Sequence, residues 1–213
     1  MKDILSRPAR DIFGPLKSFQ DRLLGNCGEY WWKAFSRFLR KEDPFRIRPE
    51  DAWISTSLPI SSNADLMVIC EAKKMLITQW AKSLCLQHQL HTSHVEDVTF
   101  VRGTTCELFG IEGGWQSEYL NEAFLKRFGL GFCKASDAFF IRSCYVEQSK
   151  GEYLHVVSAP LAGDFSAQEH IFTVGNHPEN GLQVHIDVFG TGPKCRCSSY
   201  GVDWVFRLLP DGQ

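Results

Sequence analysis

The chain has 213 residues, of which 44% are hydrophobic, 13% aromatic and 23% charged, and its formal net charge is −2. This balance indicates a soluble globular protein and excludes a disordered or collagen-like one. No apolar run approaches the roughly 20 residues that a membrane helix needs, so we expect no membrane partner.

Basic residues concentrate near the N-terminus. Residues 1–50 carry 11 basic and 7 acidic side chains, whereas residues 151–213 carry 3 and 7. The near-neutral total disfavours electrostatic binding of nucleic acid by the entire molecule, but it leaves open a local contact through the N-terminal segment.

The eight cysteines are scattered along the chain, and several lie within apolar runs, where a free thiol behaves as a small hydrophobic group. Residues 1–24 match neither a signal peptide nor an acid-poor transit peptide, because three aspartates interrupt them. A chain of this length also needs no disulfides to stabilise its core. We therefore expect reduced cysteines and a cytoplasmic location.

The first third of the sequence predicts helices. An apolar side over residues 16–24 follows Pro15, which suits a first helical turn, and Gly25 ends the pattern. The clearest helix covers residues 29–41, where aromatic residues recur at helical spacing and basic residues occupy the opposite side. Two prolines then indicate a linker.

The remainder of the chain mixes both kinds of element. The sequence predicts strands over 52–58 and 97–102 and helices over 64–86 and 117–128. The hydrophobic period then changes from helical to alternating, which predicts further strands over 138–145, 152–158, 168–174, 182–189 and 200–208.

Helices followed by a run of strands indicate an α+β fold. We expect a helical N-terminal third and then a mainly antiparallel, meandering sheet packed with one or two helices. The chain divides accordingly into a helical segment, residues 1–50, and an α+β domain, residues 51–213, with one single domain as the alternative.

Four segments resemble, in the same order, motifs of a family of bacterial proteins with no assigned activity. Tyr30–Pro44 is similar to the family's aromatic-x-x-Ala-Phe-x-x-Phe-Leu-Arg-Lys-Glu-Asn-Pro-Trp. Arg127–Ala135 is similar to its Leu-Gly-Leu-x-Leu-Cys-Pro-Ala, Gly151–Leu154 to its Gly-Glu-Trp-Leu, and Trp204–Arg207 to its closing Trp-Val-Phe-Arg. Lys134 stands where the family has proline. The resemblance implies a bacterial or phage origin and a shared fold, but no catalytic residue.

The basic side of the 29–41 helix, continued by two arginines beyond it, is the first candidate site. It consists of Lys33, Arg37, Arg40, Lys41, Arg46 and Arg48. Clustered cations suit the docking of an acidic protein partner, whose encounter they would steer. They would equally suit the phosphates of nucleic acid. The third interpretation is a solvated helix face opposite a core face, with no binding role.

A second candidate lies in the predicted strand 182–189. Residues two apart share a strand face, so His185 and Asp187 would project together. A carboxylate beside an imidazole raises its basicity, as a general base requires, and a nucleophile such as Cys144 or Ser158 would complete a hydrolase-like site. The alternative is an ordinary solvated face of an antiparallel strand.

Thiols and imidazoles near the C-terminus raise the question of a metal. Cys195 and Cys197, with His177 and His185, would form a chemically reasonable zinc site. A single residue separates the two thiols, however, where zinc sites usually have two, and no second thiol pair follows. We therefore predict no metal and no cofactor.

Motifs that would name an enzyme are missing from the sequence. It has no phosphate-binding P-loop, no Gly-x-Ser-x-Gly elbow and no His-Glu-x-x-His. We therefore expect a small binding module that recognises a protein partner, with no catalytic chemistry assigned. The alternatives are a hydrolase-like enzyme that uses His185 and Asp187 with a thiol or zinc nearby, and nucleic-acid binding by the basic N-terminal helix.

Overall fold

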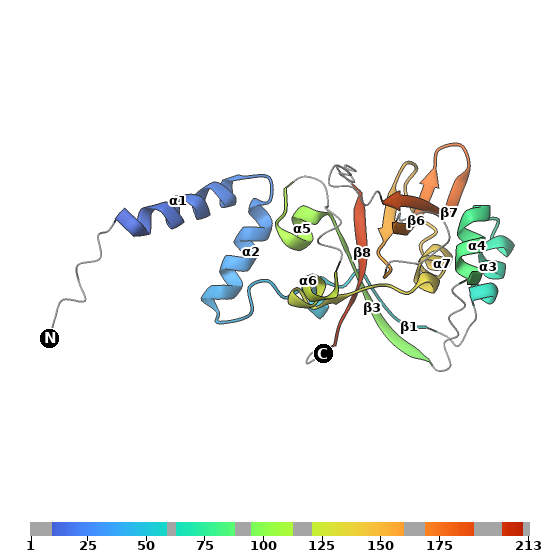
Figure 1. Cartoon of the computed structure of the whole chain (residues 1–213), viewed down its shortest axis with the longest axis horizontal. Coiled ribbons are helices and arrows are strands. Elements are labelled where there is room, and N and C mark those ends of the chain that lie inside the picture. Colours follow the sequence, from blue (N-terminus) through green and yellow to red (C-terminus); the bar gives the residue numbers. More distant parts are fainter. Residues whose placement is uncertain are drawn as a thin grey trace.

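One mixed sheet forms the centre of the protein. The structure is a computed structural model that describes residues 10–58, 63–87, 95–112, 121–159, 169–189 and 202–210. Within these ranges the strands are β1 (Ile54–Leu58), β2 (Leu76–Ile77), β3 (Glu96–Gly103), β4 (Leu130–Gly131), β5 (Tyr153–Val156), β6 (Glu169–His177), β7 (Gly181–Phe189) and β8 (Asp203–Leu208). Their order along the sheet is β1-β3-β8-β5-β6-β7-β2, and β4 also pairs with β8 (Figure 1).

The sheet is not the meander that the sequence predicts. β5, β6 and β7 pair antiparallel in chain order, as a meander requires. The C-terminal strand β8, however, enters between β3 and β5 and runs parallel to β5, and β2 runs parallel to β7. Strand alternation shows which face a residue occupies and not which strand it will pair with, so these long-range pairings could not be predicted.

Helices are spread along the chain rather than concentrated at its start. In the described ranges they are α1 (Arg10–Leu24), α2 (Gly28–Leu39), α3 (Asn63–Ala72), α4 (Gln79–Gln87), α5 (Thr105–Phe109), α6 (Glu122–Arg127) and α7 (Ala135–Cys144). A short 3-10 turn, η1 (Pro49–Asp51), precedes β1. The α+β class is confirmed, but the prediction of only one or two helices beside the sheet is wrong. None of these helices has the length and apolar character needed to cross a membrane.

Helix α7 replaces the strand predicted over residues 138–145. Seven of its ten residues are buried, and a segment that is buried on most sides shows neither helical nor strand periodicity. Asp137 stabilises its start by accepting a hydrogen bond from the Lys134 backbone at 2.8 Å. The same carboxylate accepts two hydrogen bonds from Arg207 of β8, at 2.6 and 2.7 Å, which anchors α7 to the middle of the sheet.

The long helix predicted over residues 64–86 is in fact two helices with β2 between them. The chain turns at Lys74, whose φ of 58° is uncommon outside glycine. Ile77 in β2 then lies beside Val184 of β7 and is buried. This stretch contains neither glycine nor proline, so no residue of the usual helix-breaking types marks the break.

The other predicted elements coincide with the structure to within a few residues. β1, β3, β5, β6, β7 and β8 lie where alternation placed strands. The helix predicted over 117–128 is α6 in its described part, because residues 113–120 lie outside the described ranges.

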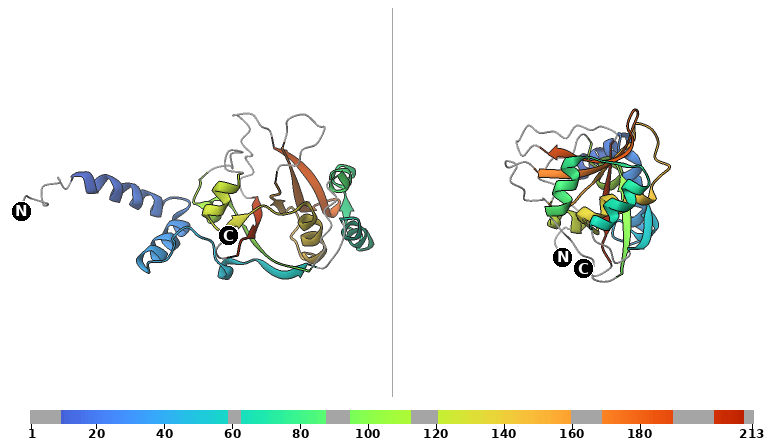
Figure 2. Two further views of the ribbon diagram at one scale, coloured as in Figure 1. Left: turned by 60° about the horizontal axis from the view of Figure 1, so that its bottom comes forward. Right: turned by 90° about the vertical axis from the view of Figure 1, so that its right-hand side faces the viewer.

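Apolar side chains cover both faces of the sheet. One face packs against α3, α4 and α7 and includes Phe139 and Phe172, whose ring centroids are 5.7 Å apart. The other packs against α5 and α6, where Phe109 meets Phe206 of β8 at 5.7 Å. α3 and α4 lie at one end of the molecule, and α1 extends from the other end (Figures 1 and 2).

The division of the chain at residue 50 stays a prediction. Ile47, from the N-terminal segment, is buried in the second apolar cluster. Its backbone N–H donates a hydrogen bond to the carbonyl oxygen of Phe128 at 2.9 Å. The linker after α2 is therefore packed against the rest of the protein.

Candidate functional site around helix α2

Helix α2 departs in part from the orientation that the sequence predicts. Its one buried residue is Ala34, and the side chain of Arg37 is only 15% exposed. Trp32, Phe38 and Leu39 are 59%, 63% and 64% exposed. The basic side predicted to face solvent thus turns partly inward, and much of the aromatic side turns outward.

α1 covers part of the aromatic side of α2. Phe19 of α1 meets Phe35 at a ring-centroid distance of 5.1 Å. The turn between the helices is tight: a Cβ at Gly28 would lie 2.3 Å from the carbonyl oxygen of Leu23, so only glycine fits. α1 extends away from the sheet, and none of its described side chains is buried (Figures 1 and 2). We call α1 and α2 the helical arm, and its aromatic face consists of Trp32, Phe35, Phe38 and Leu39.

A disulfide between Cys27 and Cys106 ties the arm to α5. The expectation of reduced cysteines is wrong for this pair. The two residues are 79 positions apart, and no spacing motif joins them, so the sequence could not pair them. Among the described cysteines, the free thiols are Cys70, Cys133 and Cys144.

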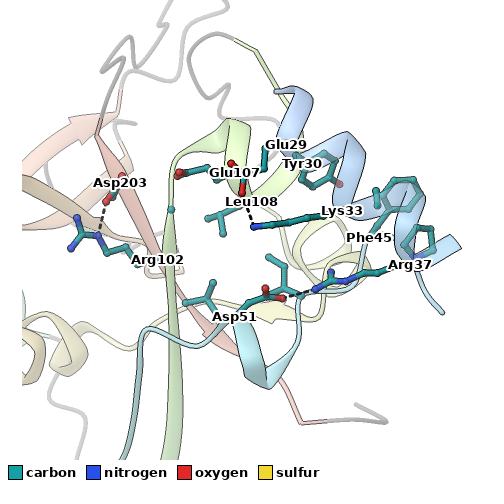
Figure 3. Close-up of a pocket in the computed structure, with 15 residues that line it drawn as sticks. Glu29, Tyr30, Lys33, Arg37, Phe45, Asp51, Arg102, Glu107, Leu108 and Asp203 are labelled. Carbon is teal, nitrogen blue, oxygen red and sulfur yellow. Dashed lines mark hydrogen bonds and ion pairs between the residues drawn. The ribbon is translucent and has the colours of Figure 1, made fainter. Parts of the chain in front are cut away.

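A pocket of about 360 Å³ lies between the inner face of α2 and the sheet (Figure 3). Its charged lining residues are Glu29, Lys33 and Arg37 of α2, Asp51 of η1, Arg102 of β3, Glu107 of α5 and Asp203 of β8. Tyr30 and Phe45 contribute aromatic rings. This volume is at the lower end of the range for small-ligand sites.

The lining includes Lys33 and Arg37 from the predicted basic set but not its other four members. Intramolecular carboxylates already hold most of the set: Lys33 lies 3.2 Å from Glu29, Arg37 2.9 Å from Asp51, Arg40 2.9 Å from Glu42 and Arg48 3.0 Å from Glu42. Arg46 donates to the carbonyl oxygen of Pro210 at 3.5 Å, and Lys41 is exposed just beyond α2. A phosphate would have to displace the carboxylates, so the set is not a preformed anion site.

Arg102 is a pocket residue that the sequence reasoning missed. Its Nε donates to Asp203 at 2.5 Å, and its terminal nitrogens reach Glu152 at 2.7 Å and the Tyr145 hydroxyl at 3.1 Å. The partners lie between 43 and 101 positions away in the chain. Only the strand order brings them together, and no local motif marks such an arrangement.

His185 and Asp187 do meet, and two further side chains join them. Strand register aligns His155 of β5, Thr173 of β6 and His185 of β7 across the sheet. The Thr173 hydroxyl donates to Asp187 at 2.7 Å, and His155 Nδ1 lies 2.9 Å from that hydroxyl oxygen. Because the hydroxyl proton goes to Asp187, His155 Nδ1 carries the proton of its own bond to Thr173. His185 Nε2 lies 3.4 Å from the Asp187 carboxylate.

The environment fixes the charges of this polar cluster. Burial lowers the pKa of His155 to about 4, so the imidazole is neutral near pH 7. Burial alone would raise the pKa of Asp187, but hydrogen bonds from His185 and Thr173 outweigh it and lower the pKa to about 2. Gln183, on the same strand face, is only 7% exposed. The face is therefore largely covered rather than solvated.

The remaining catalytic and metal candidates do not gather at this cluster. His177 lies at the β6–β7 turn, where its Nδ1 accepts hydrogen bonds from the backbone of Glu179 and Asn180. Neither Cys144 nor Ser158 hydrogen-bonds to His185 in the described part of the chain. Among the residues that the structure describes, no three metal-binding side chains form a site. Cys195 and Cys197 lie outside the described ranges.

Comparison with known proteins adds no relative. No protein-family model matches the chain, and neither a curated protein nor a solved structure does so significantly. The resemblance to a bacterial family therefore stays a prediction.

Proposed function

We propose that the protein is a binding module that captures a protein partner on the aromatic face of the helical arm. The observation that carries this proposal is the outward position of Trp32, Phe38 and Leu39, each more than half exposed. Single exposed apolar side chains are common, but a group of large ones on one helix marks an interaction surface.

Burial of this face would stabilise a complex. Covering one such side chain is worth about 1.5–3 kcal/mol, so a partner that covers all three gains about three times that amount. Tryptophan is also enriched among the residues that dominate binding energy. Phe35 packs against Phe19 of α1 and forms the base of the aromatic face.

The chemistry around the face favours an acidic partner. The N-terminal 50 residues carry an excess of basic side chains, and Arg40 and Lys41 adjoin the aromatic face at the end of α2. Such border charges mainly speed the encounter of oppositely charged proteins. We therefore propose a partner with an apolar centre and acidic surroundings.

The experiment compares capture by the wild-type protein and by a Trp32→Ala/Phe38→Ala variant. The partner captured from cell extract would be identified, purified and titrated with both proteins. We expect about a thousandfold weaker binding by the variant at a nearly unchanged melting temperature, because two hot-spot truncations at about 2 kcal/mol each lower the binding free energy by about 4 kcal/mol. Val68→Ala, which shortens an equally exposed side chain on α3, is the control. Equal affinities, or a basic partner, would contradict the proposal.

A hydrolase-like activity is the second candidate, favoured by the 3.4 Å separation of His185 Nε2 and the Asp187 carboxylate. Elemental analysis for zinc and titration of reactive thiols test it, because a zinc-bound water or a thiolate would supply the nucleophile. The sequence favours the cytoplasm as the place of action. The Cys27–Cys106 disulfide favours an oxidising compartment instead, because such bonds persist mainly there.

A further inference from the structure

The pocket between α2 and the sheet is lined by both signs of charge, but its acidic side chains outnumber its basic ones. All three guanidinium nitrogens of Arg102 have partners within the protein. The terminal nitrogens of Arg37 bond to Asp51 and to the carbonyl oxygen of Arg46, both at 2.9 Å. Each of these two arginines is thus held by at least one carboxylate, and the lining has four acidic side chains against three basic ones.

The carboxylates keep acceptor oxygens. Asp51 and Asp203 each use Oδ2 for an arginine, and Glu107 uses Oε2 for the backbone N–H and hydroxyl of Thr104. Their second oxygens accept no hydrogen bond from the residues that the structure describes. Figure 3 shows Glu107 and Asp51 on opposite sides of the hollow. A ligand that enters therefore meets acceptors from two directions.

The aromatic rings that line the pocket also favour a cationic ligand. Tyr30 and Phe45 face the pocket, and π-faces attract ammonium and guanidinium groups. Burial raises the pKa of Tyr30 to about 12, so its phenol adds no negative charge that would depend on pH near neutrality. The volume of about 360 Å³ accommodates a group the size of an arginine side chain rather than a large cofactor.

We propose that this pocket binds an alkyl guanidinium or alkylammonium group. Donors on the ligand would pair with Glu107, Asp51 and Asp203, and the ligand's apolar stem would lie against the Phe45 ring. Lys33, 64% exposed and 3.2 Å from Glu29, lies beside this space and opposes a second cation. Lys33 and Arg37, which the sequence assigns to a basic face, thus line a site that we propose to prefer cations.

The first test titrates the full-length protein with agmatine, which carries both cationic groups and no carboxylate, using calorimetry. Glu107→Gln should lower the affinity about tenfold, because a charge-assisted hydrogen bond is lost. Glutamine keeps the N-terminal cap of α5, so the fold is preserved. Lys33→Met should instead raise the affinity, by about fivefold, because a like charge is removed. Phe45→Ala should weaken binding, and Val68→Ala should leave it unchanged.

A second experiment distinguishes the two sources of the cation. An acetylated and amidated Gly-Arg-Gly peptide that binds more tightly than agmatine would identify a polypeptide side chain, and the reverse would identify a free amine. Any of three results would overturn the proposal. These are no binding of either probe, tighter binding of glutamate than of agmatine, and equal agmatine affinities of wild type and Glu107→Gln. The aromatic face lies on the other side of α2, so Trp32→Ala/Phe38→Ala should leave agmatine binding intact. Failure of one proposal is therefore separable from failure of the other.

Discussion

His155 Nδ1 and the Asp187 carboxylate are 3.7 Å apart, yet near pH 7 the imidazole is neutral and the carboxylate is charged. His155 packs against Trp204, with ring centroids 4.9 Å apart, and this burial removes the water that an imidazolium would need. Asp187 is less buried and receives hydrogen bonds from Thr173 and His185. Burial and hydrogen bonding therefore strengthen the charge pattern that the ordinary pKa values of an imidazole and a carboxylate already favour at pH 7.

We predict that the protein loses stability as the pH falls from about 6.5 to about 4. The pKa of His155 is about 4 in the folded protein against an ordinary 6.5, so between these values the unfolded chain binds a proton that the folded chain does not. The loss should reach about 3 kcal/mol below pH 4. Denaturant unfolding at a series of pH values measures it.

The control for this prediction is His155→Asn, which keeps a donor near Thr173 and does not titrate. Other ionisable groups act equally in both proteins, so the difference between the two curves isolates His155. The variant should lose less stability over this pH interval. Parallel curves for the two proteins would show that His155 titrates normally and that the argument from burial is mistaken.

At the scale of elements, the sequence located strands β5 to β8 from short runs of strand-forming residues between turn signals, although consecutive residues of β5 and β8 are buried on both faces. Helical periodicity also located α2. It failed for α7, which is buried on most sides, and for the break at Lys74, which no glycine or proline marks. For α2 it predicted one apolar and one basic side, but hydrophobicity could not show that the Arg37 side chain is only 15% exposed while Phe38 is 63% exposed.

The candidate site was predictable only on its α2 side. Lys33 and Arg37 follow from helical spacing, and His185 with Asp187 from strand alternation. The acidic side of the pocket comes from η1, α5 and β8, which only the tertiary fold brings together. Residue spacing along one helix could therefore not show that Arg37 and Arg102 are already paired to carboxylates.

The disulfide between α2 and α5 leads to a second prediction at this scale. Peptide mapping of protein purified without reductant should find Cys27 and Cys106 in one cross-linked fragment. Cys106→Ser should lower stability by about 2–5 kcal/mol, because the cross-link closes a long loop in the unfolded chain. The loss should disappear when wild type and variant are compared in reductant. A variant as stable as wild type without reductant would argue that the bond does not form.

At the scale of the whole molecule, the two ends of the chain differ in how much they contribute to the stability of the fold. β8 pairs with β3, β4 and β5, so it joins the two halves of the sheet. Trp204, Val205 and Phe206 are at most 2% exposed, and Arg207 binds the buried Asp137 of α7. α1, in contrast, has no buried side chain in its described part and lies beyond α2 from the sheet (Figure 2).

We therefore predict that truncation at the N-terminus preserves the fold and that truncation at the C-terminus destroys it. Removal of the chain before Asn26 keeps the disulfide and the sheet, so the protein should still unfold cooperatively, with a melting temperature within about 4 °C of wild type. It uncovers Phe35, so weak self-association should rise with concentration. Removal of the chain after residue 201 deletes a central strand, and near-ultraviolet circular dichroism should then show no fixed tertiary packing. A cooperative transition in the second truncation would mean that the sheet holds together without β8.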